Sequence, residues 1–148
     1  MRSGTRIPSR NRREKGRRGM LEVDLATGWE PVAGTAGIFV KPLSGAWDEA
    51  EAEGFRTRHV RFEPGGETFA AFTHPHWEEA LLIEGALTQK ESSITLRAPA
   101  YVIRPPGTPH GPLVSASGCL MIEMQYFARR RLGLADYLDA RAPQGPAG

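Results

Sequence analysis

Residues 70–85, AAFTHPHWEEALLIEG, bring histidines and glutamates together in one short stretch. His74 and His76 are followed closely by Glu78 and Glu79. Imidazole and carboxylate groups are ligands that divalent transition metals take in proteins. The stretch therefore indicates a metal site in which one of the two glutamates supplies the carboxylate.

The local geometry favours a turn between the histidines and the glutamates. One straight strand would hold His74 and Glu78, four positions apart, roughly 13 Å from each other. Pro75 also disfavours an unbroken central strand. A hairpin with strands 69–74 and 78–85 would instead bring His74 opposite Glu78. We therefore expect these two residues to share one ion across the turn.

A second stretch, RPPGTPHGP at residues 104–112, carries His110 on a loop framed by prolines. Prolines reduce the conformational freedom of the unfolded loop and so favour one direction for the imidazole. Such preorganisation suits a ligand that must meet partners about thirty residues earlier in the chain.

The elements that must position these residues are predicted to be short strands. Apolar or alternating runs separated by Gly and Pro lie at 37–43, 57–63, 67–74, 78–89, 93–98, 100–105 and 118–127. This spacing is typical of an all-β sandwich or barrel. Two stretches, 45–54 and 134–140, are predicted to be short helices.

The histidine and glutamate stretch and the His110 loop resemble the first and second motifs, respectively, of the cupin superfamily. The first motif runs Gly, His-x-His, a short gap, Glu, six residues and Gly; the second runs Pro-x-Gly-x-x-His. The matching residues are Gly66, His74, Glu78, Gly85, Pro105, Gly107 and His110. The resemblance covers about residues 36–127. It implies an all-β cupin fold, which is a β-barrel of the double-stranded β-helix or jelly-roll type, with 134–140 as a short terminal helix.

The resemblance also implies a set of metal ligands. The usual gap makes His74 the second histidine of the first motif and puts Phe72, as an apolar wall, where the first histidine would be. In the alternative register His74 and His76 are the pair and the gap is shortened. His74, Glu78 and His110 are the expected ligands, with His76 as a fourth that bends in. The remaining interpretation is a cupin without metal, whose histidines only hydrogen-bond inside a polar pocket.

Glu78, Glu123 and Gln125 are the candidate catalytic residues. The family spacing favours Glu78 over Glu79, which then becomes an exposed charge. Glu123 and Gln125 alternate along the strand predicted at 118–127 and could line the inside of the barrel. The opposite face of that strand is apolar, so the sequence leaves open which face points inward.

The ligand types allow several functions. Two imidazoles and one carboxylate are the ligand set of non-haem Fe(II) oxygenases, and Zn, Mn, Ni and Cu accept the same ligands. The chain is similar to cupins of the acetylacetone dioxygenase type, which implies a dioxygenase acting on a small chelating substrate such as a β-dicarbonyl. The alternatives are a non-catalytic sensor, similar to the cupins of anti-sigma factors, and a cofactor-independent isomerase. The edge strand predicted at 37–43 suggests a homodimer.

Composition sets the remaining limits. The 148 residues, of which 40% are hydrophobic, fit one domain, predicted at 20–141. Residues 1–19 carry a net charge of +7 and the remainder −5, so we expect a disordered basic tail at 1–19 and another disordered tail at 142–148. The basic tail could hold nucleic acid by neutralising phosphates, but an inert extension is favoured, and the absence of aromatic residues among its arginines argues against a stacking platform for single strands. The sequence shows neither a membrane span nor a signal peptide, and its one cysteine suits the cytosol.

Two further residues are expected to stay outside the site. His59 belongs to the sheet face opposite Val60 and Phe62 and is predicted to be a surface or sheet-face residue. Cys119 is predicted to be a buried small hydrophobe, because no base lies beside it in the sequence.

Overall fold

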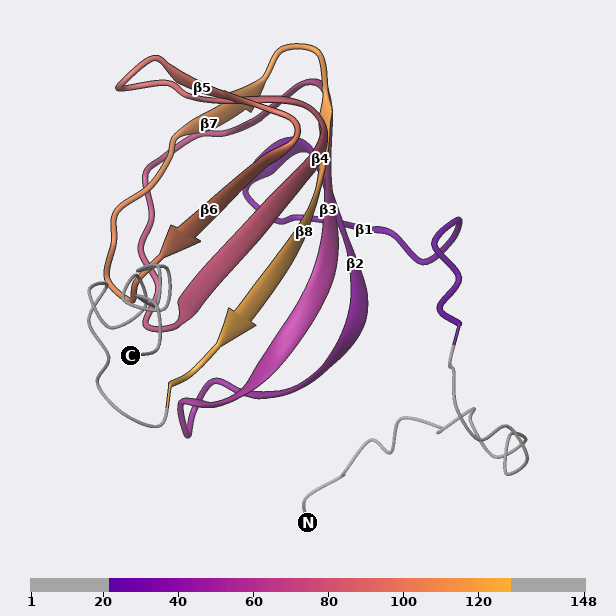
Figure 1. Ribbon diagram of the computed structural model, residues 1–148, viewed down its shortest axis with the longest axis vertical. Helices are drawn as coiled ribbons and strands as arrows, with labels where there is room; N and C mark the ends of the chain where they lie inside the picture. The colour runs from indigo at the N-terminus through magenta and orange to yellow at the C-terminus, as the bar shows by residue number, and fades with distance from the viewer. Residues whose placement is uncertain (1–21, 129–148) are drawn as a thin grey trace, which may run out of the picture.

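The computed structural model describes residues 22–128, and all regular secondary structure in that range is β-strand (Figure 1). The strands are β1 (Glu30–Pro31), β2 (Thr35–Asp48), β3 (Glu53–Thr68), β4 (Trp77–Gln89), β5 (Ile94–Arg97), β6 (Ala100–Arg104), β7 (Leu113–Ser115) and β8 (Cys119–Tyr126). The two predicted tails, the helix predicted at 134–140 and the predicted domain ends lie outside the described residues. Within them, no helix is long and apolar enough to cross a membrane.

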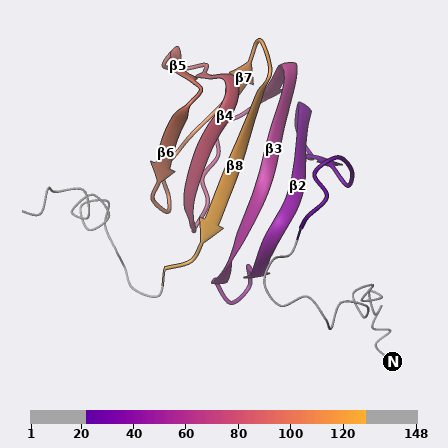
Figure 2. The ribbon, with the colours of Figure 1, turned by 45° about the vertical axis from the view of Figure 1, so that its right-hand side comes forward.

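The strands close into an antiparallel barrel. β8 pairs with both β3 and β4, and β7 pairs with the same two strands farther along them. β3 and β4 are thus joined twice, which completes a circuit of hydrogen-bonded strands. β2 extends the sheet beyond β3, and β6 and β5 extend it beyond β4 (Figure 2). The predicted all-β cupin barrel is confirmed.

The inward-facing side chains change from polar to apolar at one level of the barrel. On β3, Arg58 is followed by Val60 on the cavity-facing side. On β8, which runs antiparallel to β3, Met121 precedes Glu123 on the same side. The apolar end forms the core, whose buried members are Ile38, Val60, Phe62, Ala80, Leu82, Leu87, Leu113, Cys119 and Met121. The polar end is therefore a separate zone, set on a packed apolar base.

The helix predicted at 45–54 is wrong. β2 and β3 run through this region and are joined by a turn at 49–52, with Trp47 paired to Gly54. Gly54 has φ of +102°, and a Cβ there would lie 1.9 Å from the carbonyl oxygen of Ala46. A residue with a side chain would clash at this point, so glycine permits the close cross-strand approach that ends in the turn.

The strand predicted at 67–74 and its hairpin are also wrong. β3 ends at Thr68, and the chain crosses to β4 through an irregular segment, 69–76. Within this segment Phe72 makes one two-way backbone bridge to His110, with N···O distances of 2.9 and 3.0 Å. β4 pairs instead with β6 and β8, because barrel closure supplies strand partners on both of its edges. The crossing segment is thereby free to carry side chains into the polar end.

Candidate metal centre

Glu78 is the centre of the polar end. It is the second residue of β4, is only 4% exposed, and faces the cavity. Nη1 of Arg104 donates to its Oε1 at 2.7 Å, and Nε2 of Gln125 donates to its Oε2 at 2.6 Å. β6 and β8 flank β4 and place these two donors opposite Glu78 in the strand register. The carboxylate is therefore held from both sides.

His74 and His110 approach the same carboxylate from the two loops. Nε2 of His74 lies 3.3 Å from Oε2 of Glu78, and Nε2 of His110 lies 3.8 Å from Oε1. The Nδ1 atoms of His74 and His110 lie 3.1 and 3.0 Å from the carbonyl oxygens of His76 and Thr108. A carbonyl accepts only from N–H, so each Nδ1 carries a proton and each Nε2 is the ring nitrogen that faces Glu78. Orientation by such a bond at the far nitrogen is usual for metal-binding histidines.

His76 joins this group. Its ring stacks on the ring of His74 with centroids 3.9 Å apart, and the ligand atoms of His74, His76 and Glu78 all lie within 4.8 Å of one another. His76 is 4% exposed, and neither of its ring nitrogens has a hydrogen-bond partner among the described residues. Three of the four residues predicted as ligands thus lie in one tight group, and His110 approaches that group on its Glu78 side.

The pKa values of these groups reflect burial and one another's charge. Burial opposes the charged form of His74, but its interaction with Glu78 outweighs burial and raises its pKa. Burial and the neighbouring His74 lower the pKa of His76 to about 4. Burial also lowers the pKa of His110. For Glu78 the burial effect is exceeded by His74 and Arg104, so its pKa lies far below the ordinary value. The ionised Glu78 and the lowered pKa values of His76 and His110 suit metal binding, whereas His74 would have to release any proton on Nε2 in order to coordinate.

Glu123 and Gln125 point inward, which settles the orientation that the sequence left open. Gln125 is 2% exposed, and its Oε1 accepts from Nε of Arg56 at 2.6 Å. Glu123 receives two bonds from Arg58 on the same oxygen, Oε2, from Nε at 2.9 Å and from Nη2 at 2.8 Å. Burial and the charge of Glu78 raise the pKa of Glu123 despite the opposing effect of Arg58.

Sequence reasoning missed the arginines of this network. Arg58 shares the inward face of β3 with Val60 and Phe62, and the alternation that placed His59 on the other face could have found it. Arg104 stands directly before the two prolines of the His110 loop, where nothing local distinguished it.

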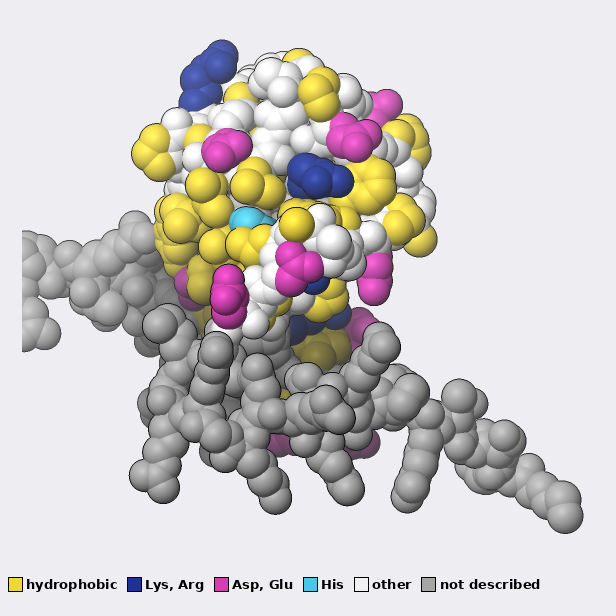
Figure 3. Space-filling view, turned by 90° about the vertical axis from the view of Figure 1, so that its right-hand side faces the viewer, with side chains coloured by type: hydrophobic (Ala, Val, Ile, Leu, Met, Phe, Trp, Pro, Cys, Tyr) yellow, Lys and Arg dark blue, Asp and Glu magenta, His cyan; other side chains and the backbone are white. Residues whose placement is uncertain are grey.

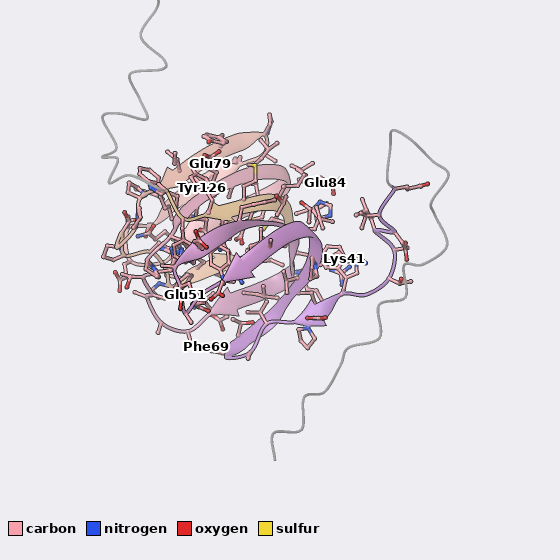
Figure 4. All side chains as sticks on the ribbon, turned by 90° about the horizontal axis from the view of Figure 1, so that it is seen from below. Lys41, Glu51, Phe69, Glu79, Glu84 and Tyr126 are labelled. Atoms are coloured by element: carbon pink, nitrogen blue, oxygen red, sulfur yellow. The ribbon has the colours of Figure 1, made fainter. Side chains whose placement is uncertain are left out.

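Several other residues lie apart from the centre. Glu79 points outward and accepts from the hydroxyls of Tyr101 at 2.5 Å and Tyr126 at 2.7 Å. Seen from below, Glu79 and Tyr126 lie together at one side of the barrel (Figure 4). Glu79 is therefore not the carboxylate of the centre. It is also only partly exposed, because the tyrosines hold it.

His59 lies on the outer side of β3, as its alternation predicted, but it is not a surface residue. Its ring stacks on Trp29 of the segment before β1, with centroids 5.7 Å apart, and it is 8% exposed. Hydrophobic side chains are also visible on the outside of the barrel beside lysine and arginine (Figure 3). Cys119 is buried in the core as expected, and burial raises the pKa of its thiol.

A cavity of about 360 Å³ adjoins the centre. Glu78, Arg104 and His110 line it, whereas His74 and His76 do not, so the cavity touches one side of the centre. Phe72 also lines the cavity, with its ring 4.1 Å from that of His110. Most of the remaining wall is apolar, including Val60, Phe62, Leu87, Leu113 and Met121. The volume lies in the range of sites for small molecules.

Comparison with known proteins agrees with this geometry. The family model described as the ChrR cupin-like domain matches residues 20–127. The chain belongs to this family. No functionally curated protein matches the sequence.

Solved structures show the same fold at low sequence identity. The acetylacetone dioxygenase of Acinetobacter johnsonii is 18% identical, with a TM-score of 0.55 over 84% of this cupin and 95% of that chain. The polyketide cyclase RemF of Streptomyces resistomycificus is also 18% identical, with a TM-score of 0.57 over 84% and 95% of the two chains. The structure of Rhodobacter sphaeroides SigE with the anti-sigma ChrR gives 16% identity and a TM-score of 0.51 over 66% and 48%. These neighbours differ in function, so the likeness establishes the fold.

Proposed function

We propose that His74, Glu78 and His110, with His76 beside them, hold one divalent metal ion. We propose further that this cupin is a metal-dependent enzyme of the dioxygenase type, acting on a small chelating substrate such as a β-dicarbonyl. The observation that carries the proposal is the set of buried imidazole nitrogens. Both nitrogens of His76 and Nε2 of His110 have no hydrogen-bond partner among the described residues, although each is buried. Buried polar atoms are normally satisfied, and a metal ion would satisfy these.

The donor set fits such an ion. Nδ1 of His74 and of His110 is held by a backbone carbonyl, which leaves the Nε2 lone pairs for coordination. Glu78 has already accepted one hydrogen bond on each oxygen, but a carboxylate oxygen has further lone pairs. Iron(II) or zinc is favoured, and manganese, nickel and copper share these ligand types. When bound, the metal would supply Lewis-acid chemistry and, for a redox metal, the reaction with oxygen.

The residues of the chain would prepare the substrate. Glu123 lines the cavity, and both of its bonds from Arg58 fall on Oε2, so Oε1 is not held by Arg58. The raised pKa of Glu123 makes it a stronger base than an ordinary carboxylate. We propose that Oε1 removes the acidic C–H proton of the dicarbonyl, so that the substrate becomes a chelating enolate. Arg58 stabilises the substrate charge, and Phe72 closes the wall beside His110 against water.

Elemental analysis tests the metal. Protein purified without an affinity tag or chelator should contain close to one equivalent of a transition metal, and His110→Ala should contain little. His59→Ala is the matched control, because that buried histidine lies on the opposite side of β3. Wild-type protein that holds no metal after incubation with iron(II) or zinc contradicts the proposal. Oxygen uptake with acetylacetone then tests the dioxygenase assignment separately.

A second candidate is a small-molecule binding domain without turnover. It is favoured by the pairing of Glu78 with Arg104 and Gln125, which already balances the carboxylate in the absence of a metal. Binding of a small molecule without oxygen uptake, in protein loaded with iron(II), would support this function over the enzymatic one.

A further inference from the structure

Arg104 and the proposed metal ion would both interact with the same oxygen of Glu78, Oε1. Oε1 accepts from Arg104 at 2.7 Å, and the same Oε1 faces Nε2 of His110 at 3.8 Å. A metal held between His110 and Glu78 would therefore stand next to the guanidinium of Arg104. Like charges at this separation repel strongly in a buried site. The arrangement raises the question of what would offset the added charge.

The fixed charges of the polar end do not offset it. The network contains three arginines, Arg56, Arg58 and Arg104, against two glutamates, Glu78 and Glu123. This leaves an excess of one positive charge before any metal is added. A divalent ion bound to neutral imidazoles would increase the excess further. Uncompensated buried charge is costly, so an anion would be favoured together with the metal.

The cavity shows where that anion would lie. Arg58 and Arg104 both line it, and the side chain of Arg104 is 15% exposed. The rest of the wall is mostly apolar, so an anion with an apolar body would match it. A cavity of about 150 Å³ holds a benzene ring. The 360 Å³ available here leaves room for a ring and a carboxylate.

We propose that this cavity binds a small monoanion with an apolar body, that Arg104 and Arg58 hold its anionic group, and that the anion and the metal bind cooperatively. The proposal rests on the metal site proposed above. In it, Arg104 neutralises Glu78 until the metal arrives and then turns its guanidinium to the anion in the cavity. Arg104 thus couples the two ligands.

Titration calorimetry with zinc and benzoate tests the coupling. Zinc is titrated into the full chain, in a buffer free of carboxylate and phosphate, with and without benzoate. Benzoate should tighten zinc binding by at least about fivefold, the lower end of ordinary coupling between sites, and zinc should tighten benzoate binding by the same factor. Benzyl alcohol, which has the ring without the charge, should have no such effect.

Arginine variants test which residues carry the coupling between zinc and benzoate. Arg104→Met should bind zinc more tightly than wild type without benzoate, because Oε1 is released and one cation is removed, and it should lose most of the coupling. Arg58→Met should weaken the coupling without tightening zinc. The matched control is Arg61→Met, because Arg61 packs over Trp29 and Phe39 on the outside of the barrel. This variant should keep the wild-type values.

The outcomes separate the two proposals. Zinc binding that benzoate leaves unchanged overturns the anion site and leaves the metal centre standing. Coupling that persists fully in both Arg104→Met and Arg58→Met overturns the role of the arginines. No zinc binding with or without benzoate overturns the metal centre itself. If Arg104→Met does not fold, the wild-type coupling and Arg58→Met decide.

Discussion

The most demanding test of the site's architecture is the substitution Gln125→Met. Gln125 is 2% exposed and connects the two sides of the polar end. Its Nε2 donates to Oε2 of Glu78 and its Oε1 accepts from Nε of Arg56, both at 2.6 Å. Methionine has similar length and volume and adapts to irregular surroundings, so the change removes two hydrogen bonds with little loss of packing.

The expected cost follows from these two bonds. A hydrogen bond to a charged group contributes about 1.5–3 kcal/mol, so removing both would cost roughly 3–6 kcal/mol. Glu78 keeps its bond from Arg104, and Arg56 keeps its contact over the Trp47 ring at 4.2 Å. We therefore expect the lower end, about 3 kcal/mol. This corresponds to a fall in melting temperature of roughly 10–20 °C for a domain of this size.

Urea unfolding of the metal-free protein measures this cost, with the free energy extrapolated to water. Gln89→Met is the matched control, because the side chain of Gln89 lies at the far end of β4, away from the polar end of the barrel. It should change the free energy of unfolding by no more than about 0.5 kcal/mol. The Gln125→Met chain should also lose about 10–100-fold in metal affinity, as when a group that orients a ligand is removed. A loss of stability below about 1 kcal/mol would show that Gln125 does not hold Glu78 in this way.

Three further predictions concern the histidines and the assembly. His110→Ala should remove most of the bound metal while His59→Ala retains it, and equal metal contents in the two variants would rule out His110 as a ligand. The free energy of unfolding of the metal-free protein should fall as pH decreases from about 6.5 toward 4. The lowered pKa values of His59, His76 and His110 mean that these three rings bind protons more readily when unfolded, and they outnumber His74, whose raised pKa acts in the opposite direction. A flat profile in urea titrations would contradict this. A homodimer stays a prediction, but β1 already pairs with β2 at Phe39 and Val40, so two copies would have to meet farther along β2 than the predicted edge. Sedimentation velocity should then show a dimer, and a monomer at all concentrations would exclude it.

The barrel could be predicted from the sequence because it depends on local alternation and turn residues. The strands predicted at 78–89 and 100–105 agree with β4 and β6 to within one residue at each end. The region at 45–54 failed because its acidic and alanine residues have good helix propensity, and nothing local reveals that β2 and β3 continue into it. Tertiary pairing overrode the local preference.

The ligand set of the site stays a prediction, whereas the predicted construction of the site was wrong. The sequence motifs identified His74, Glu78 and His110, and the structure brings them together. The predicted hairpin was absent, because β4 finds its neighbours in β6 and β8. An irregular segment presents His74 instead. Barrel closure decides which strands flank Glu78. No short stretch of sequence could therefore have predicted these neighbours.

The barrel tolerates a buried polar site because its charges are paired at one end and an apolar core stabilises the other end. Buried charges are tolerated only when they are paired, and at this end Arg58 pairs with Glu123 and Arg104 with Glu78. The imidazoles are the exception, since nitrogens of His76 and His110 are buried without partners in the described structure, as are those of His59. His76 and His110 differ from His59 in lying beside Glu78. A chain selected only for stability would satisfy or replace such groups. Imidazoles of this kind beside the Glu78 carboxylate, above an apolar core, are the pattern expected where a ligand completes the site.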